Sequence, residues 1–341
     1  MHFAIPGIND GHVYLGTDPS SYDNLERTTE RLEYLLSQGV TGVRDMAVDA
    51  RYLSYVSRQG YLGEIASPDI YYSALTAGES FFSDSMTRAA TQGLVPGSAP
   101  WMRAIHSKTD VDIVMAQAKG TGATSIKVYA DLDHQNIARI VEAAHLQDML
   151  VWAHACVFPA SPYEVCQSRV DVMSHTNYMV WESQSDIPKS AKSRHRKQEH
   201  FDINDQSYTE LIKLMANKGT ILDATIGLYK GYFSDSTLYQ YGVSITKLAH
   251  ANKVKIGVDT DIPIIDAVEI PPIIIEMKAL QEYVNMTPIE IIKSASLIIA
   301  QIIVAVDRVG SIHIGKKGQP LNHKTKPFRV YRSSNQPSSG D

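Results

Sequence analysis

Gly122–Ala155 reads GATSIKVYADLDHQNIARIVEAAHLQDMLVWAHA. The β-branched and aromatic residues of Ser125–Ala130 predict a strand, because such side chains fit a pleated, half-buried surface. Gln135–Leu146 follows with apolar residues three and four positions apart, which is the spacing of one face of an α-helix. Leu150–Ala155 is a second strand-like run after a short turn. A strand, a helix and a further strand in this order form the unit of parallel α/β folds.

The same alternation extends over most of the chain in both directions. The other predicted strands are Phe3–Ile5 with Val13–Leu15, Thr41–Met46, Ile70–Leu75, Asp171–His175, Thr220–Ile226 and Lys255–Asp259. Eight strands alternating with helices predict an α/β fold of the (β/α)8 TIM-barrel type. An open, doubly wound sheet alternates in the same way, but no G-x-G-x-x-G motif follows the first strand.

Composition excludes several classes of protein. The chain has 341 residues, 44% of them hydrophobic, and 32 Lys+Arg against 37 Asp+Glu give a net charge of 32 − 37 = −5. This balance is typical of a soluble globular protein and argues against nucleic acid or anionic membrane as a partner. Apolar runs such as Ser296–Val306 are too short to span a bilayer, and the first residues do not resemble a signal peptide. With two cysteines, we expect a cytoplasmic, reducing location.

Side chains that can bind metal ions lie on or at the ends of five predicted strands. Parallel strands of a barrel open their carboxyl ends onto one face, where the active sites of this fold lie. A lone histidine on a strand is more often a hydrogen-bonded core residue than a metal ligand. The prediction of a metal site therefore rests on all five residues together. The five residues are His12, Lys127, His154, His175 and Asp259.

Several segments also resemble a known family. AIPGINDGHVYL (Ala4–Leu15) resembles the opening strand of the amidohydrolase superfamily, whose pattern is an apolar run, P-G and then D-x-H-x-H. GVTGVRDM (Gly39–Met46), GATSIKVYADL, DVMSHTNYMVWE (Asp171–Glu182) and IGVDTD (Ile256–Asp261) are similar to later segments in family order. The resemblance covers roughly residues 3–318. It is to the imidazolonepropionase-like and prolidase-like (Xaa-Pro dipeptidase-like) branch.

This resemblance implies a function and a set of metal ligands. It implies that His12 binds a buried metal and that Lys127, carboxylated by CO2, bridges two metals. His154 and His175 would bind the second metal, while Asp259 would bind the first and act as general base. Imidazole and carboxylate ligands suit Zn²⁺. The implied reaction is hydrolysis of a C–N bond in an amide, peptide or cyclic amide, with a small-molecule or dipeptide-like substrate.

One departure from the family pattern bears directly on that function. The H-x-H of the first strand reads His12-Val13-Tyr14, so a phenol replaces one imidazole. A phenol, with a pKa near 10, is a poor ligand at neutral pH. We therefore expect one or two divalent metals, with the first bound weakly or not at all. Tyr14 and Tyr129 are predicted to contact substrate, and a core position stays open as the alternative for Tyr129. A catalytically impaired relative with a binding or interaction role stays open as the alternative.

We assign residues 1–318 to the barrel and 319–341 to a poorly ordered C-terminal tail. Family members carry a small β-sandwich domain, which we expect to be absent or incomplete, because the chain begins near the first barrel strand and Pro320 interrupts a C-terminal strand. The isoleucine-rich segment Ile289–Val304 is interpreted as a surface prone to association, which keeps a homo-oligomer open.

Overall fold

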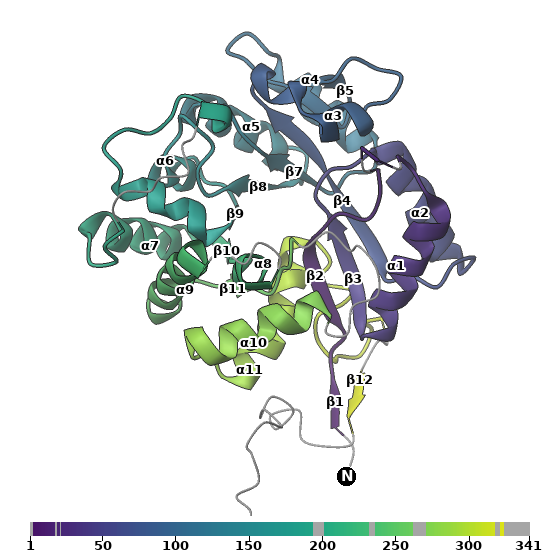
Figure 1. Ribbon diagram of the computed structural model, residues 1–341. Coiled ribbons are helices and arrows are strands. Elements are labelled where there is room, and N and C mark those ends of the chain that lie inside the picture. The colour runs from purple at the N-terminus through teal and green to yellow at the C-terminus, as the bar shows by residue number, and fades with distance from the viewer. Residues whose placement is uncertain are drawn as a thin grey trace, which may run out of the picture.

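The computed structural model describes residues 3–17, 19–20, 22–193, 201–231, 236–261, 271–317 and 321–323. Within these ranges, eight parallel strands form a nearly closed barrel with helices between them (Figure 1). This confirms the predicted TIM-barrel fold. In order around the barrel the strands are β2 (Ile8–Val13), β3 (Val40–Asp45), β4 (Asp69–Ala77), β7 (Ser125–Val128), β8 (Leu150–His154), β9 (Val172–Ser174), β10 (Ile221–Asp223) and β11 (Ile256–Gly257).

The first and last strands approach each other through bonds just beyond the end of β11. The amide of Asp261 donates to the carbonyl oxygen of His12 over 2.8 Å. The hydroxyl of Thr260 donates to Oδ2 of Asp10 over 2.8 Å, and the amide of Thr260 to Oδ1 over 3.2 Å. These contacts join residues about 250 positions apart in the sequence and bring the end of β11 against β2.

Helices surround the barrel, and their starts follow from local sequence. Most begin at a side chain that accepts a hydrogen bond from an amide of the first turn, as Asn24, Asp110 and Asp133 do. The helices are α1 (Leu25–Ser37), α2 (Ala50–Leu62), α3 (Ser85–Ala89), α4 (Val111–Gly120), α5 (His134–His145), α6 (Pro162–Gln167), α7 (Gln206–Lys218), α8 (Ile226–Gly231), α9 (Ser236–Ala251), α10 (Pro272–Val284), α11 (Pro288–Lys293) and α12 (Ile299–Ile302). None of these helices in the described ranges is long and apolar enough to cross a membrane.

The position of the first barrel strand differs from the prediction. The barrel uses β2, whereas Phe3–Ile5 forms β1 outside it and pairs antiparallel with β12 (Leu321–His323). Asn9, Asp10 and His12 are buried polar residues. Because of them β2 lacks the apolar pattern by which a strand is recognised in a sequence. Apart from β12, the predicted C-terminal tail lies outside the described residues.

The isoleucine-rich segment is part of the core, and the expectation of an association surface there is wrong. Ile298, Ile299 and Ile302 are buried in a cluster with Trp152 and other residues of the barrel strands. The first of these belongs to a π-helical turn, η4 (Ser294–Ile298), which contacts β2 and β11. The segment thus packs against the amino-terminal end of the barrel, because burial removes its apolar surface from water.

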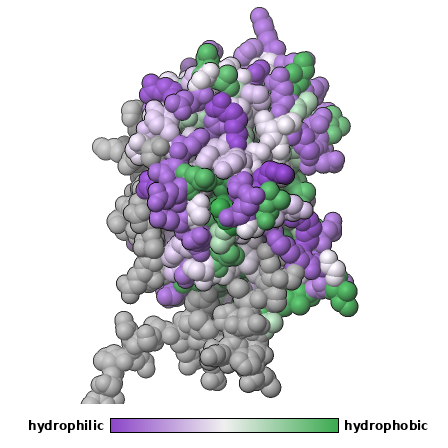
Figure 2. Space-filling model, turned by 90° about the vertical axis from the view of Figure 1, so that its right-hand side faces the viewer, coloured by the Kyte–Doolittle hydropathy of each residue, from purple (hydrophilic) through white to green (hydrophobic). Residues whose placement is uncertain are grey.

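Two short strands, β5 (Ser98–Ala99) and β6 (Met102–Ala104), extend the sheet beside β4 and were not predicted. Figure 2 shows the molecule from the side where α1 and α2 lie in Figure 1. Most of the described residues on this face are hydrophilic, and hydrophobic residues occur among them as scattered patches (Figure 2).

Candidate metal centre

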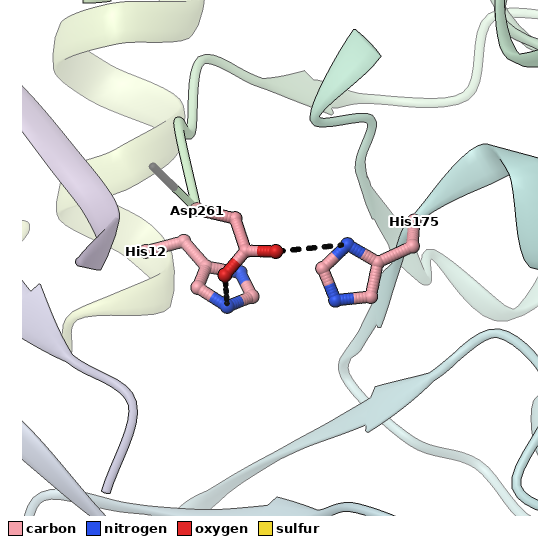
Figure 3. A group of neighbouring side chains, drawn as sticks. All are labelled: His12, His175 and Asp261. Atoms are coloured by element: carbon pink, nitrogen blue, oxygen red, sulfur yellow. Dashed lines mark ion pairs between the residues drawn. The ribbon is translucent and has the colours of Figure 1, made fainter. Parts of the chain in front are cut away.

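Three side chains meet at the carboxyl end of the barrel (Figure 3). His12 belongs to β2, His175 follows β9 and Asp261 follows β11. Nε2 of His12 lies 3.1 Å from Oδ1 of Asp261, and Nδ1 of His175 lies 3.7 Å from Oδ2. One ligand atom from each residue can be chosen so that all three lie within 4.8 Å of one another. A single cation could therefore contact all three.

Asp223, the last residue of β10, orients the imidazole of His12. Its Oδ2 lies 2.7 Å from Nδ1 of His12, and both side chains are fully buried. Burial by itself would lower the pKa of His12, but the charges of Asp261 and Asp223 outweigh it and raise the pKa to about 9. With Nδ1 donating to Asp223, Nε2 is the atom directed at Asp261. This carboxylate–histidine arrangement is the usual support of a metal-binding imidazole.

His175 has a left-handed backbone conformation, with φ of 71°, at the end of β9. Its amide donates to the carbonyl oxygen of Asp223 over 2.9 Å, and Nδ1 lies 2.8 Å from Oγ1 of Thr225. Burial lowers the pKa of this imidazole to about 3, against the attraction of Asp261. His175 is therefore neutral at physiological pH, which is the form that binds metals.

The structure also brings Lys127 and His154 to this end of the barrel. Lys127 is fully buried, its Nζ lies 3.2 Å from Oγ of Ser174, and burial lowers its pKa to about 8. The ring of His154 lies 4.8 Å from that of His175 and is stacked on Tyr178 at 5.6 Å. Four of the five predicted ligands thus gather around one position.

Asp259, the fifth predicted ligand, is buried beside the cluster rather than in it. Its Oδ1 accepts a hydrogen bond from the amide of Gly11 over 2.8 Å. Glycine is required there, since a Cβ would lie 2.4 Å from that oxygen. Burial, together with the charges of Asp223 and Asp10, raises the pKa of Asp259 well above its ordinary value.

The sequence interpretation did not select Asp261 or Asp223. Both carried a usable signal, because Asp223 ends a strand and Asp261 is the second aspartate of I-G-V-D-T-D. Asp261 reaches the histidines because its backbone is left-handed, with φ of 52°. The proton-accepting role of Asp259 stays a prediction.

A cavity of about 590 Å³ adjoins this cluster, and Asp261, Tyr14 and Tyr129 all line it. Burial raises the pKa of Tyr14 well above its usual value, and neighbouring Tyr129 acts in the same direction. Tyr14 therefore remains a neutral phenol. Whether Tyr14 takes the place of the histidine of the H-x-H pattern stays a prediction.

The residues present fit a divalent cation. Two imidazoles and a carboxylate are ligands that Zn²⁺ prefers. Nε2 of His12 is buried and, apart from the ion pair with Asp261, has no hydrogen-bond partner among the described residues. A cation bound between this imidazole and the carboxylate of Asp261 would replace their ion pair, so the donor set is suited to a metal.

Comparison with known proteins identifies the fold. The sequence matches no protein-family model and no curated protein. A solved structure of a Xaa-Pro dipeptidase with bound methionine superimposes with a TM-score of 0.70 at 19% identity, over 96% of this chain and 82% of that one. The A. niger ochratoxinase gives 0.72 at 18%, over 96% and 78%, and phenylurea hydrolase B gives 0.68 at 15%, over 96% and 81%. The chain therefore has the barrel fold of the prolidase-like amidohydrolases.

Proposed function

We propose that this protein is a metal-dependent hydrolase of the amidohydrolase superfamily, which cleaves a C–N bond in an amide, peptide or cyclic amide. The observation that carries the proposal is the meeting of His12, His175 and Asp261 at the carboxyl end of a barrel of the prolidase type. Active sites of this fold are built at that end.

His12, His175 and Asp261 would hold the cation, with Zn²⁺ as the metal that their chemistry favours. His154 and carboxylated Lys127 are the ligands proposed for a second cation. Tyr14 stands in place of a histidine ligand of the cation at His12, so whether the site holds one cation or two stays open. When bound, a divalent cation polarises a carbonyl group and lowers the pKa of water to about 7.

Two carboxylates, those of Asp259 and Asp261, follow β11. One is needed to accept a proton and the other to bind the cation. The family resemblance gives Asp259 the proton-accepting role, and its pKa would fall once cations lie beside it. Asp261 lines the cavity and lies between His12 and His175, which suits it to contact a cation bound there. We propose Asp259 as general base, with Asp261 as the metal ligand. Tyr14 and Tyr129 would bind the substrate from the cavity wall.

The alternative is a catalytically impaired relative that binds a ligand without hydrolysing it. The observation that favours it is Tyr14, which stands where the family pattern has a histidine and stays a phenol. The two functions differ in turnover, so one set of variants separates them.

The test combines metal analysis with assays on a panel of amides and dipeptides. We expect the wild-type protein loaded with Zn²⁺ to hydrolyse at least one of them. Asp261→Asn should lower metal affinity about tenfold or more, because it removes a charged ligand. Asp259→Asn should retain metal and lose about a hundredfold or more of the activity, the scale of general-base catalysis. The control is Asp186→Asn, an exposed residue outside the site.

Full metal loading without turnover of any substrate would establish the binding role instead. Activity retained in Asp259→Asn but lost in Asp261→Asn, with metal still bound, would transfer the proton-accepting role to Asp261.

A further inference from the structure

Four buried side chains of the barrel strands carry polar atoms that have no hydrogen-bond partner in the described part of the chain. Arg44 contributes Nε, Nη1 and Nη2, Asn9 both polar atoms of its amide, Tyr71 its hydroxyl and Trp152 its Nε1. Buried polar groups without partners are rare in native proteins. Several of them in one region of the molecule therefore point to a bound group.

These side chains lie close to one another inside the barrel. Arg44 of β3 and Tyr71 of β4 are register partners on adjacent strands, so their side chains project from the same face of the sheet. Cζ of Arg44 lies 5.0 Å from the centre of the Trp152 ring, and Tyr71 and Trp152 belong to the apolar cluster that η4 and α12 complete. Oδ1 of Asn9 would lie 2.4 Å from a Cβ built on Gly42, which precedes Arg44 by two residues on β3.

The guanidinium of Arg44 is a buried charge that lacks hydrogen bonds. Burial lowers the pKa of Arg44 to about 9, against the attraction of Asp259, so the group stays charged at neutral pH. Within the described ranges neither Asp259 nor Asp171 accepts a hydrogen bond from it. The face of the Trp152 ring attracts the charge but supplies no oxygen acceptor. Burying a charge in this way is costly unless its N–H groups are bound.

The polar atoms of this region are mostly hydrogen-bond donors. A guanidinium has five N–H groups, an amide side chain two, and an indole and a phenol one each. The unpartnered acceptors are fewer, namely Oδ1 of Asn9, the hydroxyl oxygen of Tyr71 and, farther along the barrel, Oδ2 of Asp259. Water brings hydrogen atoms that need acceptors, whereas an anion only accepts. The close packing of a barrel interior also requires this anion to be small.

We propose that the barrel interior binds one small inorganic anion of the halide type, held by Arg44 with the hydroxyl of Tyr71 and the indole N–H of Trp152 as further donors. This site is separate from the candidate metal centre, and it does not depend on the proposed hydrolase function. The anion is structural. It offsets the buried charge, and it stabilises the folded barrel because the unfolded chain does not bind it.

The direct test locates bromide by anomalous scattering in crystals of the full-length protein, purified and crystallised with bromide in place of chloride. We expect a bromide peak within about 3.5 Å of a guanidinium nitrogen of Arg44. Bromide found only on the surface or at the candidate metal centre would overturn the inference. A water molecule beside Arg44, with no anomalous signal, would overturn it as well.

The second test compares the Tm of the protein in sodium chloride and in sodium gluconate at equal ionic strength, since gluconate is too large for the barrel interior. The wild-type Tm should be about 2 °C or more higher in chloride. Tyr71→Phe keeps the ring and removes one donor, so this difference should fall by about half or more. Arg44→Met should abolish it.

Arg58→Met is the matched control, because Arg58 is an exposed guanidinium on α2. It should keep the wild-type difference between the two salts. If Arg44→Met does not fold, Tyr71→Phe and the bromide position decide the question. Equal Tm values of the wild-type protein in the two salts, or a chloride effect that both folded variants retain, would overturn the inference.

Discussion

Glu276 shows at the scale of one residue how the barrel tolerates a buried carboxyl group. The side chain belongs to α10, is 1% exposed, and accepts hydrogen bonds from the amides of Ile226 (3.2 Å) and Gly227 (2.5 Å). Burial raises its pKa to about 8, although these two hydrogen bonds act in the opposite direction. The carboxyl group therefore keeps its proton at neutral pH, and the cost of burying a charge is avoided.

This raised pKa makes part of the stability depend on pH. The stabilising contribution of the protonated Glu276 is fully present below 4.5, the pKa of this carboxyl group in the unfolded chain. It is lost as pH rises to about 8, its pKa in the folded protein. In Glu276→Gln that contribution is absent. Urea unfolding at pH 4.5, 6, 7 and 8.5 should therefore show the wild-type free energy of unfolding falling relative to the variant, by up to about 1.4 kcal/mol per pH unit. Parallel curves would contradict this assignment.

At the scale of elements, η4 and α12 (residues 294–302) together close the amino-terminal end of the barrel and form its plug. The wider π-helical turn carries Ser296, whose hydroxyl donates to the carbonyl oxygen of Ile292 over 2.6 Å. Ile299 is fully buried, and its Cδ1 would lie 3.0 Å from a Cβ built on Gly257 of β11. The plug thus packs directly against the strand that leads to Asp259 and Asp261.

Ile299→Ala should lower the free energy of unfolding by about 2–5 kcal/mol, the usual cost of a cavity in a well-packed core. The matched substitution Ile289→Ala should change it by less than about 0.5 kcal/mol, because Ile289 is 63% exposed. Chemical denaturation of both variants gives the comparison. Effects of similar size would show that Ile299 is not part of the plug.

At the scale of the whole molecule, closure of the barrel and assembly of the candidate metal centre depend on the same contacts. Asp10 accepts hydrogen bonds from both the amide and the hydroxyl of Thr260. The next residue, Asp261, donates its amide to the carbonyl oxygen of His12 and directs its carboxylate at the same residue's imidazole. A barrel that opens here would also separate His12 from Asp261, the two candidate ligands.

Asp10→Ala should therefore lower both stability and metal affinity. Removing the acceptor leaves the buried amide of Thr260 without its hydrogen bond, which costs about 1–3 kcal/mol of unfolding free energy. Affinity for Zn²⁺, measured by calorimetry, should fall about tenfold or more, as it does when groups that support a ligand are lost. Asp186→Ala, at an exposed position, is the control for both measurements. If Asp10→Ala is destabilised but binds Zn²⁺ with unchanged affinity, then the contacts that close the barrel do not position His12 and Asp261.

Local sequence determined the order of strands and helices, because alternating short β-rich runs and amphipathic helical spacing are properties of neighbouring residues. It also placed His12, Lys127, His154 and His175 at one end of the barrel, since strand ends are local and parallel strands share a direction. The first barrel strand, β2, was predicted at the wrong residues because it buries polar side chains such as those of Asp10 and His12.

Which carboxylate joins the two histidines was decided only by tertiary structure. Asp259 and Asp261 are two residues apart, and both are compatible with the sequence pattern. The selection of Asp261 depends on a left-handed backbone and on hydrogen bonds to a strand about 250 residues earlier. The cavity between α1 and the candidate metal centre also forms only when these distant segments come together. Such contacts have no signature in any short stretch of sequence, because their partners are neighbours only after the barrel closes.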